Sequence, residues 1–399
     1  YNYNSLAFVP SEFAYGEDHT IKATYVNAYM GYWGTRYSQI TKINEAYSNL
    51  KKYGKMSDAD KTRLEAEIRF MRAYVYFDLV KRYKEVIIYD ENMDAIVKDK
   101  ALSTEEQAWD FIQADFDFAA DKLPVKEDAK GRLDRGAAYA MLTRTMLYAK
   151  RYDAVISASE AIAKLGYDLE KKYSDSYSKT ISSGNVEAIL QYLFNRAENI
   201  THSFDFYYTP GGDFTMHGET GGGYGTPTQE LVESYELATG GFPDWSDWHD
   251  VGVTQTPPYA LLEPRFQATV LYNGSQWKGR EIQPWLGGAD GFCEWNVEPE
   301  PNGRTTTGYY LRKMVDETHN VIQYTSGVQP FTVIRYAEVL LNRAEALYKT
   351  GKEGDANDIV NKIRDRVGLP ALSVDGEELM AAIRQERKVE FAFEGLWYW

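Results

Sequence analysis

The chain has 399 residues, 44% of them hydrophobic and 15% aromatic, so it is long enough for a large packed core and its composition excludes disorder. Its 44 basic and 59 acidic side chains give a net charge of −15, which repels phosphate backbones and excludes nucleic acid as an expected partner. A single cysteine, Cys293, excludes an internal disulfide framework and a cysteine-based zinc site.

The first half of the chain is predicted to be helical. Helical patterns cover residues 35–53, 64–83, 104–124 and 135–166. In the third of these, Ser103 or Thr104 can cap the helix, and Glu105 and Glu106 suit its positive N-terminal end.

Two stretches, 135–166 and 334–370, look like copies of one helix pair. Each reads as a helix that ends in Leu-Tyr, a short basic turn, and a second helix that opens with Asp-Ala. In the second copy Ile334, Ala337 and Leu341 recur at helical spacing on one face. Length and pattern are typical of the tetratricopeptide type of repeat, which has about 34 residues.

The middle, residues 200–329, differs from both flanks because it is rich in Gly, Pro, Thr, Tyr and Trp and has little helical periodicity. Short alternating pieces at 265–274 and 306–315 predict hairpin strands. We therefore expect a loop-rich region inserted between helical repeats, where binding residues concentrate.

The stretch 240–250, GGFPDWSDWHD, is the most unusual of the loop-rich region. Asp244, Asp247 and Asp250 stand three apart, whereas a calcium loop of the EF-hand type needs oxygen ligands at alternate positions. His249, among polar residues, reads as a surface histidine. The sequence also lacks HExxH, GxSxG and phosphate-loop motifs. We therefore expect no metal ion, no cofactor and no catalytic residue.

Tryptophan beside aspartate on loops suits carbohydrate, because sugar rings stack on aromatic planes while their hydroxyls bond to carboxylates and amides. The competing interpretation is that these large rings pack the loops onto the helices. The candidate ligand-binding residues are Tyr207, Tyr208, Trp245, Asp247, Trp248, Trp277 and Trp285, with Tyr3 and Asn4 as weaker candidates.

Several blocks of the sequence together resemble the SusD/RagB family. These blocks are PFTVIRYAEVLLNRAEALYKTG, DANDIVNKIRDRVGLP and IRQERKVEFAFEG near the end, and TPTQELVESYE, LEPRFQATVLYNG and GYYLRKMV before them. WGTRYSQITKINEAYSNL and LEAEIRFMRAYVYFDLVKRY resemble the early helices of the family. One departure is Glu263, where the family usually carries aspartate before Pro-Arg.

The resemblance implies a mostly α-helical fold, in which tetratricopeptide-like helix pairs form an α-α superhelix and a loop-rich region with small β-hairpins holds the ligand. It also implies a surface-exposed lipoprotein of the outer membrane of a Gram-negative bacterium. Such a protein binds oligosaccharide without cleaving it and delivers it to a SusC-like TonB-dependent transporter. The lipid anchor would precede the first residue of this chain, which we expect to be truncated at both ends.

We expect three parts within one integrated domain: an N-terminal helical part (1–199), the loop-rich ligand-binding region (200–329) and a C-terminal helix-pair unit (330–399). Two other functions remain open. A helical glycoside hydrolase or polysaccharide lyase would need two carboxylates across a cleft, with Asp244, Asp247, Asp290 and Glu294 as candidates. A tetratricopeptide-type scaffold would bind a protein or peptide instead.

Overall fold

The computed structural model describes residues 31–92, 100–126, 131–249, 256–291, 304–323, 326–397 and 399, together with the backbone of Ala14–Tyr15. The predicted sites Tyr3 and Asn4, the candidate carboxylate Glu294, Asp250 of the 240–250 stretch, and Cys293 lie outside these residues.

Long helices form two groups, one before and one after the middle part of the sequence. The first group comprises α2 (Trp33–Tyr53), α3 (Asp58–Tyr83), α4 (Glu105–Lys122), α5 (Arg135–Tyr148) and α6 (Tyr152–Ala163). The second group comprises α13 (Tyr336–Lys349), α14 (Glu353–Arg366) and α15 (Gly376–Glu390). The mostly α-helical fold and both helix pairs, α5–α6 and α13–α14, are thereby confirmed. Thr104, not Ser103, caps α4: its side chain accepts a hydrogen bond from the Gln107 backbone.

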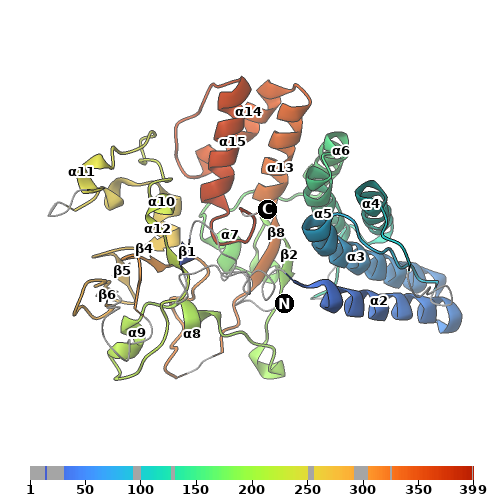
Figure 1. Cartoon of the computed structure of the whole chain (residues 1–399), viewed down its shortest axis with the longest axis horizontal. Coiled ribbons are helices and arrows are strands. Elements are labelled where there is room, and N and C mark those ends of the chain that lie inside the picture. Colours follow the sequence, from blue (N-terminus) through green and yellow to red (C-terminus); the bar gives the residue numbers. More distant parts are fainter. Residues whose placement is uncertain are drawn as a thin grey trace.

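The two predicted repeats pack on each other, although residues 167–333 separate them in the sequence. Helix α13 contacts both α5 and α6, so the second repeat continues the layer of the first (Figure 1). Small residues such as Ala140 and Ala344 are completely buried, which allows close approach of neighbouring helices. Phe70 and Phe116, 5.2 Å apart between ring centroids, extend the same core between α3 and α4.

Strand β8 (Phe331–Arg335) precedes α13 directly and pairs antiparallel with β2 (Ala188–Tyr192). Ile334, predicted to lie on the helical face, instead belongs to this strand and faces Leu190. The prediction was wrong at this position because the stretch Phe331–Arg335 is rich in β-branched residues and completely buried, and it therefore extends into a ribbon.

The middle of the chain consists of short elements joined by loops. Elements α10–α12 and β4–β6 lie on the opposite side of α13–α15 from α2–α6, and α7 lies below α13–α15 in the view of Figure 1. The helices are α7 (Asp175–Ser178), α8 (Phe204–Tyr208), α9 (Gly212–Thr215), α10 (Gln229–Val232), α11 (Ser246–His249) and α12 (Pro264–Thr269). Single 3-10 turns occur at Ile181–Ser183, Arg196–Glu198 and Tyr259–Leu261. The strands are β3 (Thr226–Pro227), which pairs with β1 (Ala14–Tyr15), β4 (Val270–Leu271), which pairs with β7 (Tyr310–Leu311), and β5 (Gln276–Trp277), which pairs with β6 (Arg280–Glu281).

The expected strands at 265–274 and 306–315 are therefore only partly correct. Val270–Leu271 and Tyr310–Leu311 do pair antiparallel, but residues 264–269 form helix α12. Pro264 at its first turn starts this helix, since proline lacks the N–H that a first turn leaves unpaired.

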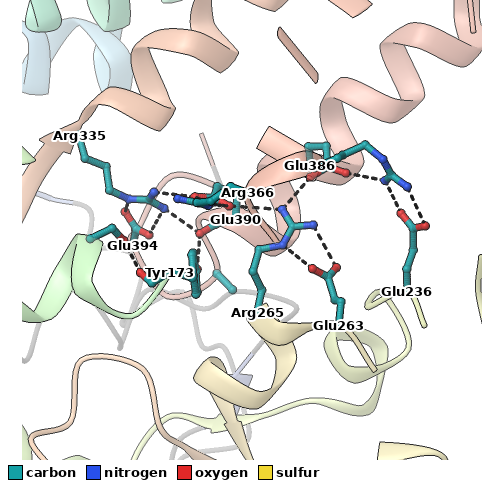
Figure 2. A network of polar contacts seen from close by, with 12 residues as sticks. Tyr173, Glu236, Glu263, Arg265, Arg335, Arg366, Glu386, Glu390 and Glu394 are labelled. Atoms are coloured by element: carbon teal, nitrogen blue, oxygen red, sulfur yellow. Dashed lines mark hydrogen bonds and ion pairs between the residues drawn. The ribbon is translucent and has the colours of Figure 1, made fainter. Parts of the chain in front are cut away.

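A buried network of charges, which we call the charge network, attaches the loop-rich region to the C-terminal helices (Figure 2). In it, Arg364 of α14 bonds Glu236 at 2.6 Å and Glu386 of α15 at 2.8 Å, and Glu386 in turn accepts from Arg265 of α12 at 2.7 Å. Glu390 continues the chain, accepting from Arg335 at 2.6 Å. The full set comprises Glu187, Glu236, Glu263, Arg265, Lys313, Arg335, Arg364, Arg366, Glu386, Glu390 and Glu394.

Each of the six C-terminal blocks that carry the resemblance contributes at least one residue to the charge network. Glu263, where this sequence departs from the pattern of the family, binds Arg265 through both carboxylate oxygens, at 2.5 and 3.1 Å. Both side chains are buried. A buried pair of this kind is costly to break, since removing one partner leaves the other charge unpaired in a low-dielectric interior.

Candidate functional site

The stretch around α11 is built by a local turn. Asp244 accepts hydrogen bonds from the backbone N–H of Ser246 at 3.1 Å and from its hydroxyl at 2.7 Å, which starts the single turn of α11. These bonds lower the pKa of Asp244. Asp247 is exposed on this turn, and His249 is also exposed, its Nε2 lying 2.6 Å from Glu233. His249 is thus a surface histidine paired with a carboxylate.

The two tryptophans of this stretch belong to an aromatic cluster, which we define as Trp245, Trp248, Tyr259, Tyr272 and Tyr309. Trp245 is only 7% exposed and packs edge-on against Trp248, with 6.0 Å between ring centroids. Tyr259 joins them, 6.3 Å from Trp245 and 4.7 Å from Tyr272. Trp248, Tyr259 and Tyr272 remain half-buried, so the cluster has partly open rings at its edge.

A row of hydrogen bonds runs along one side of the aromatic cluster. The hydroxyls of Tyr259 and Tyr309 lie 2.8 Å apart, and Tyr309 donates to Gln229 at 2.6 Å. Gln229 donates to Glu233 at 2.9 Å, and Glu233 pairs with His249. Burial raises the pKa of Tyr309 well above its ordinary value, so its hydroxyl stays protonated. The sequence did not single out Tyr259, Tyr272 or Tyr309, because nothing in their spacing shows that they converge.

Trp285 stands on a separate loop, residues 283–291, which we call the Trp285 loop. Its indole is 48% exposed and the neighbouring Leu286 is 61% exposed. The loop is closed by its own backbone: Gly288 donates to Trp285, and both Asp290 and Gly291 donate to the carbonyl of Gln283. An exposed tryptophan is therefore held on a loop with a defined conformation.

The carboxylate of Asp290 fixes the base of the Trp285 loop. Its carboxylate is buried and binds both terminal nitrogens of Arg280 at 2.8 Å, while the backbone N–H groups of Gln283 and Gly212 donate to it at 2.7 and 3.0 Å. Arg280 also bonds Asp213 at 2.9 Å. Asp290 is thus a structural carboxylate, and it does not present a free oxygen to a cleft.

The remaining predicted residues are less accessible. Trp277 is 0% exposed, and its Nε1 donates to Asp213 at 3.0 Å; Tyr208 is 1% exposed and stacks on Phe204 at 4.3 Å. Neither ring has an open face in the structure. Tyr207 is half-buried and stacks on Tyr224 at 5.2 Å. The structure thus brings Trp245, Asp247 and Trp248 together around α11, whereas Trp285 stands on its own loop.

Within the described residues, no group of three or more His, Cys, Asp or Glu side chains is arranged to hold a metal ion, and no helix is long and apolar enough to cross a bilayer. A hollow of about 450 Å³ is lined by side chains of α5, α13 and α15 together with Leu396, Trp397 and Trp399.

In comparison with known proteins, this chain is similar to SusD-like proteins in both sequence and fold. A curated SusD-like protein of Bacteroides ovatus is 25% identical over an alignment that covers 100% of this chain and 72% of the relative. The crystal structure of a SusD-like protein from Bacteroides fragilis is 28% identical, with a TM-score of 0.84 and coverage of 100% of this chain and 82% of the other. A laminarin-binding SusD-like protein has the same fold, with a TM-score of 0.71 at 21% identity over 98% of this chain and 84% of the other.

Two family models account for most of the sequence. The model described as "Starch-binding associating with outer membrane" matches residues 3–147, and its description connects the family with carbohydrate and with the outer membrane. The model of the SusD family matches residues 186–399. Because this second match spans more than half of the sequence, the chain belongs to the SusD family.

Proposed function

We propose that this protein binds an oligosaccharide at the outer surface of the cell and passes it on uncleaved. Members of the SusD family are carbohydrate-binding proteins and not enzymes. The observation that carries the proposal for this chain is the Trp285 loop, which presents an exposed indole on a backbone closed by its own hydrogen bonds. A loop backbone that is already ordered loses little conformational freedom when a sugar ring stacks on the indole that it carries.

The aromatic cluster is the second contact point in this proposal. Trp248 offers a half-buried ring, and Asp247 beside it offers an exposed carboxylate that accepts hydrogen bonds from sugar hydroxyls. Tyr207 is a further candidate at the edge of its stack with Tyr224. Trp277 and Tyr208 are left out, since a buried ring cannot stack on a ligand without rearrangement. A laminarin-binding relative of the same fold supports a glycan as the ligand class.

The test of binding is a glycan-array screen followed by calorimetry with the best oligosaccharide. Trp285→Ala should weaken binding about tenfold or more, because it removes a stacked aromatic face. Trp285→Phe should retain part of the affinity, since it keeps a ring. Leu102→Ala removes another exposed apolar side chain, just before helix α4 in the N-terminal helical part, and serves as the control. Unchanged affinity in Trp285→Ala would remove this loop from the site.

The protein should leave every glycan of the array intact. Release of new reducing ends that is abolished by Asp247→Asn would instead establish a hydrolase. The proposal also includes delivery of the glycan, in which a SusC-like TonB-dependent transporter receives it from this protein. Detergent extracts of the outer membrane should yield such a transporter when the tagged protein is purified, and a strain without the protein should take up the bound oligosaccharide more slowly.

A further inference from the structure

A compact polar junction joins the start of α8 to the segment between β7 and β8. We call it the His202 junction and define it as His202, Asp205, His319, Gly327 and Gln329. His202 and Gly327 exchange two backbone hydrogen bonds, at 3.1 and 2.6 Å. A Cβ on Gly327 would lie only 2.6 Å from the His202 ring and 2.7 Å from the Asp205 carboxylate, so the two segments are in close contact.

The hydrogen bonds of the His202 ring fit its neutral form. Its Nδ1 accepts from the backbone N–H of Phe204 at 3.2 Å, and its Nε2 donates to the carbonyl of Gln329 at 3.2 Å. A ring nitrogen that accepts carries no proton, so the ring is the neutral tautomer with hydrogen on Nε2. Ser203 gives α8 no side-chain cap, and the His202 ring supplies a partner for the first N–H of this helix instead.

The second histidine of the junction is bonded differently. Nδ1 of His319 lies 2.7 Å from Oδ2 of Asp205, and because an ionised carboxylate only accepts, this nitrogen donates. Asp205 also accepts from the backbone N–H of Asp316 at 2.9 Å. A positive charge on His319 would therefore lie beside a carboxylate. A second proton on His202 would instead point its Nδ1–H at the N–H of Phe204, where two donors face each other.

The surroundings of His202 also oppose a charged ring. Burial, the largest influence, lowers the pKa of His202, since the ring is 8% exposed and packs edge-on against Phe194. His319 acts in the same direction, whereas Asp205 and Asp316 oppose it. Because the pKa is lower in the folded state, the stabilisation is complete above about pH 6.5, the ordinary pKa of histidine, and is lost as the pH falls through the lowered value.

We propose that the His202 junction is an acid-sensitive contact, in which protonation of Nδ1 breaks the bond to Phe204 and detaches the start of α8 from residues 326–329. The protein then has a closed junction at neutral pH and an open one in acid. This inference goes beyond glycan binding and does not depend on it. Helix α8 also carries Tyr207, whose ring stacks on Tyr224, so the opening would loosen one candidate sugar contact.

Hydrogen exchange measured by mass spectrometry, expressed as protection factors, tests the junction between about pH 7.5 and about pH 5, where histidines titrate. Protection of residues 204–208 and 326–329 should fall severalfold as the pH decreases. Protection of α4, which packs on α3 and α5 in the helical part, should stay constant. His202→Gln should abolish the fall, because an amide offers an acceptor and a donor that do not titrate.

His217→Gln is the matched control, because it removes an exposed histidine and should leave the fall intact. Titration of the ring resonances of the five histidines by NMR gives a readout that needs no folded variant. One resonance should titrate at the pH at which protection is lost. Constant protection in the wild-type protein, a fall that persists in His202→Gln, or a loss of protection that matches no histidine resonance would overturn the inference. Glycan binding is tested separately and stands or fails by itself.

Discussion

The side chain of Glu390 forms ion pairs with three arginines from different elements of the fold. Its carboxylate is completely buried and accepts from Arg335 at 2.6 Å, from Arg366 at 2.5 Å and from Arg265 at 3.3 Å, so that residues from a strand and two helices meet on it. Burial alone would raise its pKa, but these three guanidinium groups hold the pKa of Glu390 below its ordinary value. The carboxylate is therefore ionised in the folded protein at neutral pH.

Glu390→Gln should lower the free energy of unfolding by about 3 to 5 kcal/mol, because the three arginines lose a shared counter-charge in a buried site. Urea denaturation measures this loss. Glu317→Gln is the control, since Glu317 pairs with Arg312 at the surface, where an ion pair contributes about 1 kcal/mol or less. Equal losses in the two variants would show that the charge network is not the main attachment of the loop-rich region.

Trp277 and Trp285 mark the limit of prediction from sequence at the scale of single residues. Both are tryptophans of the same loop-rich region, eight positions apart, and the sequence gives them equal standing. Partners distant in the sequence distinguish them: the Trp277 indole donates to Asp213, more than sixty residues earlier, and packs in a buried hydrophobic cluster, whereas Trp285 stays exposed. Which ring stays open depends on such distant partners, so the candidate set could be predicted as a group but not sorted.

The start of a helix is predicted better from the sequence than the exposure of a single side chain. Helix α4 begins where Thr104 and Gln107 cap each other, the side chain of each bonding the backbone of the other at 3.2 and 3.0 Å. Thr104→Ala should destabilise the protein by about 1 kcal/mol, the usual contribution of such a cap. Ser103→Ala is the matched control and should change stability much less. Urea midpoints that shift equally in both variants would contradict this account of the helix start.

Helices α2 and α3 are joined by Asp78, which gives the protein a defined response to acid. Asp78 on α3 accepts from Arg36 of α2 at 2.6 Å and lies beside Arg82 and Lys81 of its own helix. Burial opposes ionisation, but the three cations lower the pKa of Asp78 from 3.8 to about 2. Because the pKa is lower in the folded state, the stabilisation is complete above about pH 4 and is lost as the pH falls through about 2.

The expected contribution of Asp78 is about 2 kcal/mol, since each pKa unit corresponds to about 1.4 kcal/mol. Asp78→Asn should therefore lower stability by this amount at pH 7. The difference between the wild-type protein and the variant should shrink as the pH is lowered from 4 to 2, which thermal unfolding at a series of pH values will measure. A difference that stays constant across this range would exclude the ionic origin.

At the scale of the whole molecule, the charge network predicts one cooperative unit. It connects the loop-rich region to α14 and α15, and these helices pack through α13 onto α5 and α6. Tryptophan fluorescence, to which the loop-rich region contributes five of nine tryptophans, should therefore report the same thermal transition as far-UV circular dichroism, which follows the helices. An earlier fluorescence transition would show that the loop-rich region unfolds by itself.

The arrangement of the whole could be predicted only in part. Helical periodicity predicted the helix pairs, because alanine and leucine positions such as Ala337 and Leu341 repeat on one face. The charge network could not be predicted, since a glutamate such as Glu236 ordinarily reads as a surface residue and its partner Arg364 lies 128 positions away. The one available signal was that these charges stand among apolar residues in the blocks that resemble the SusD family.

The Trp285 loop is closed by its own backbone, because Asp290 and Gly291 donate to the carbonyl of Gln283. The Asp290 carboxylate pairs with Arg280, which holds the loop in place. The residues that tie the region to the helices lie elsewhere, in the charge network. Mutations at the tip of the loop can therefore accumulate over evolution without loosening the scaffold. Under the proposed function, this loop is therefore the segment to exchange between SusD-like proteins when a new glycan preference is to be engineered.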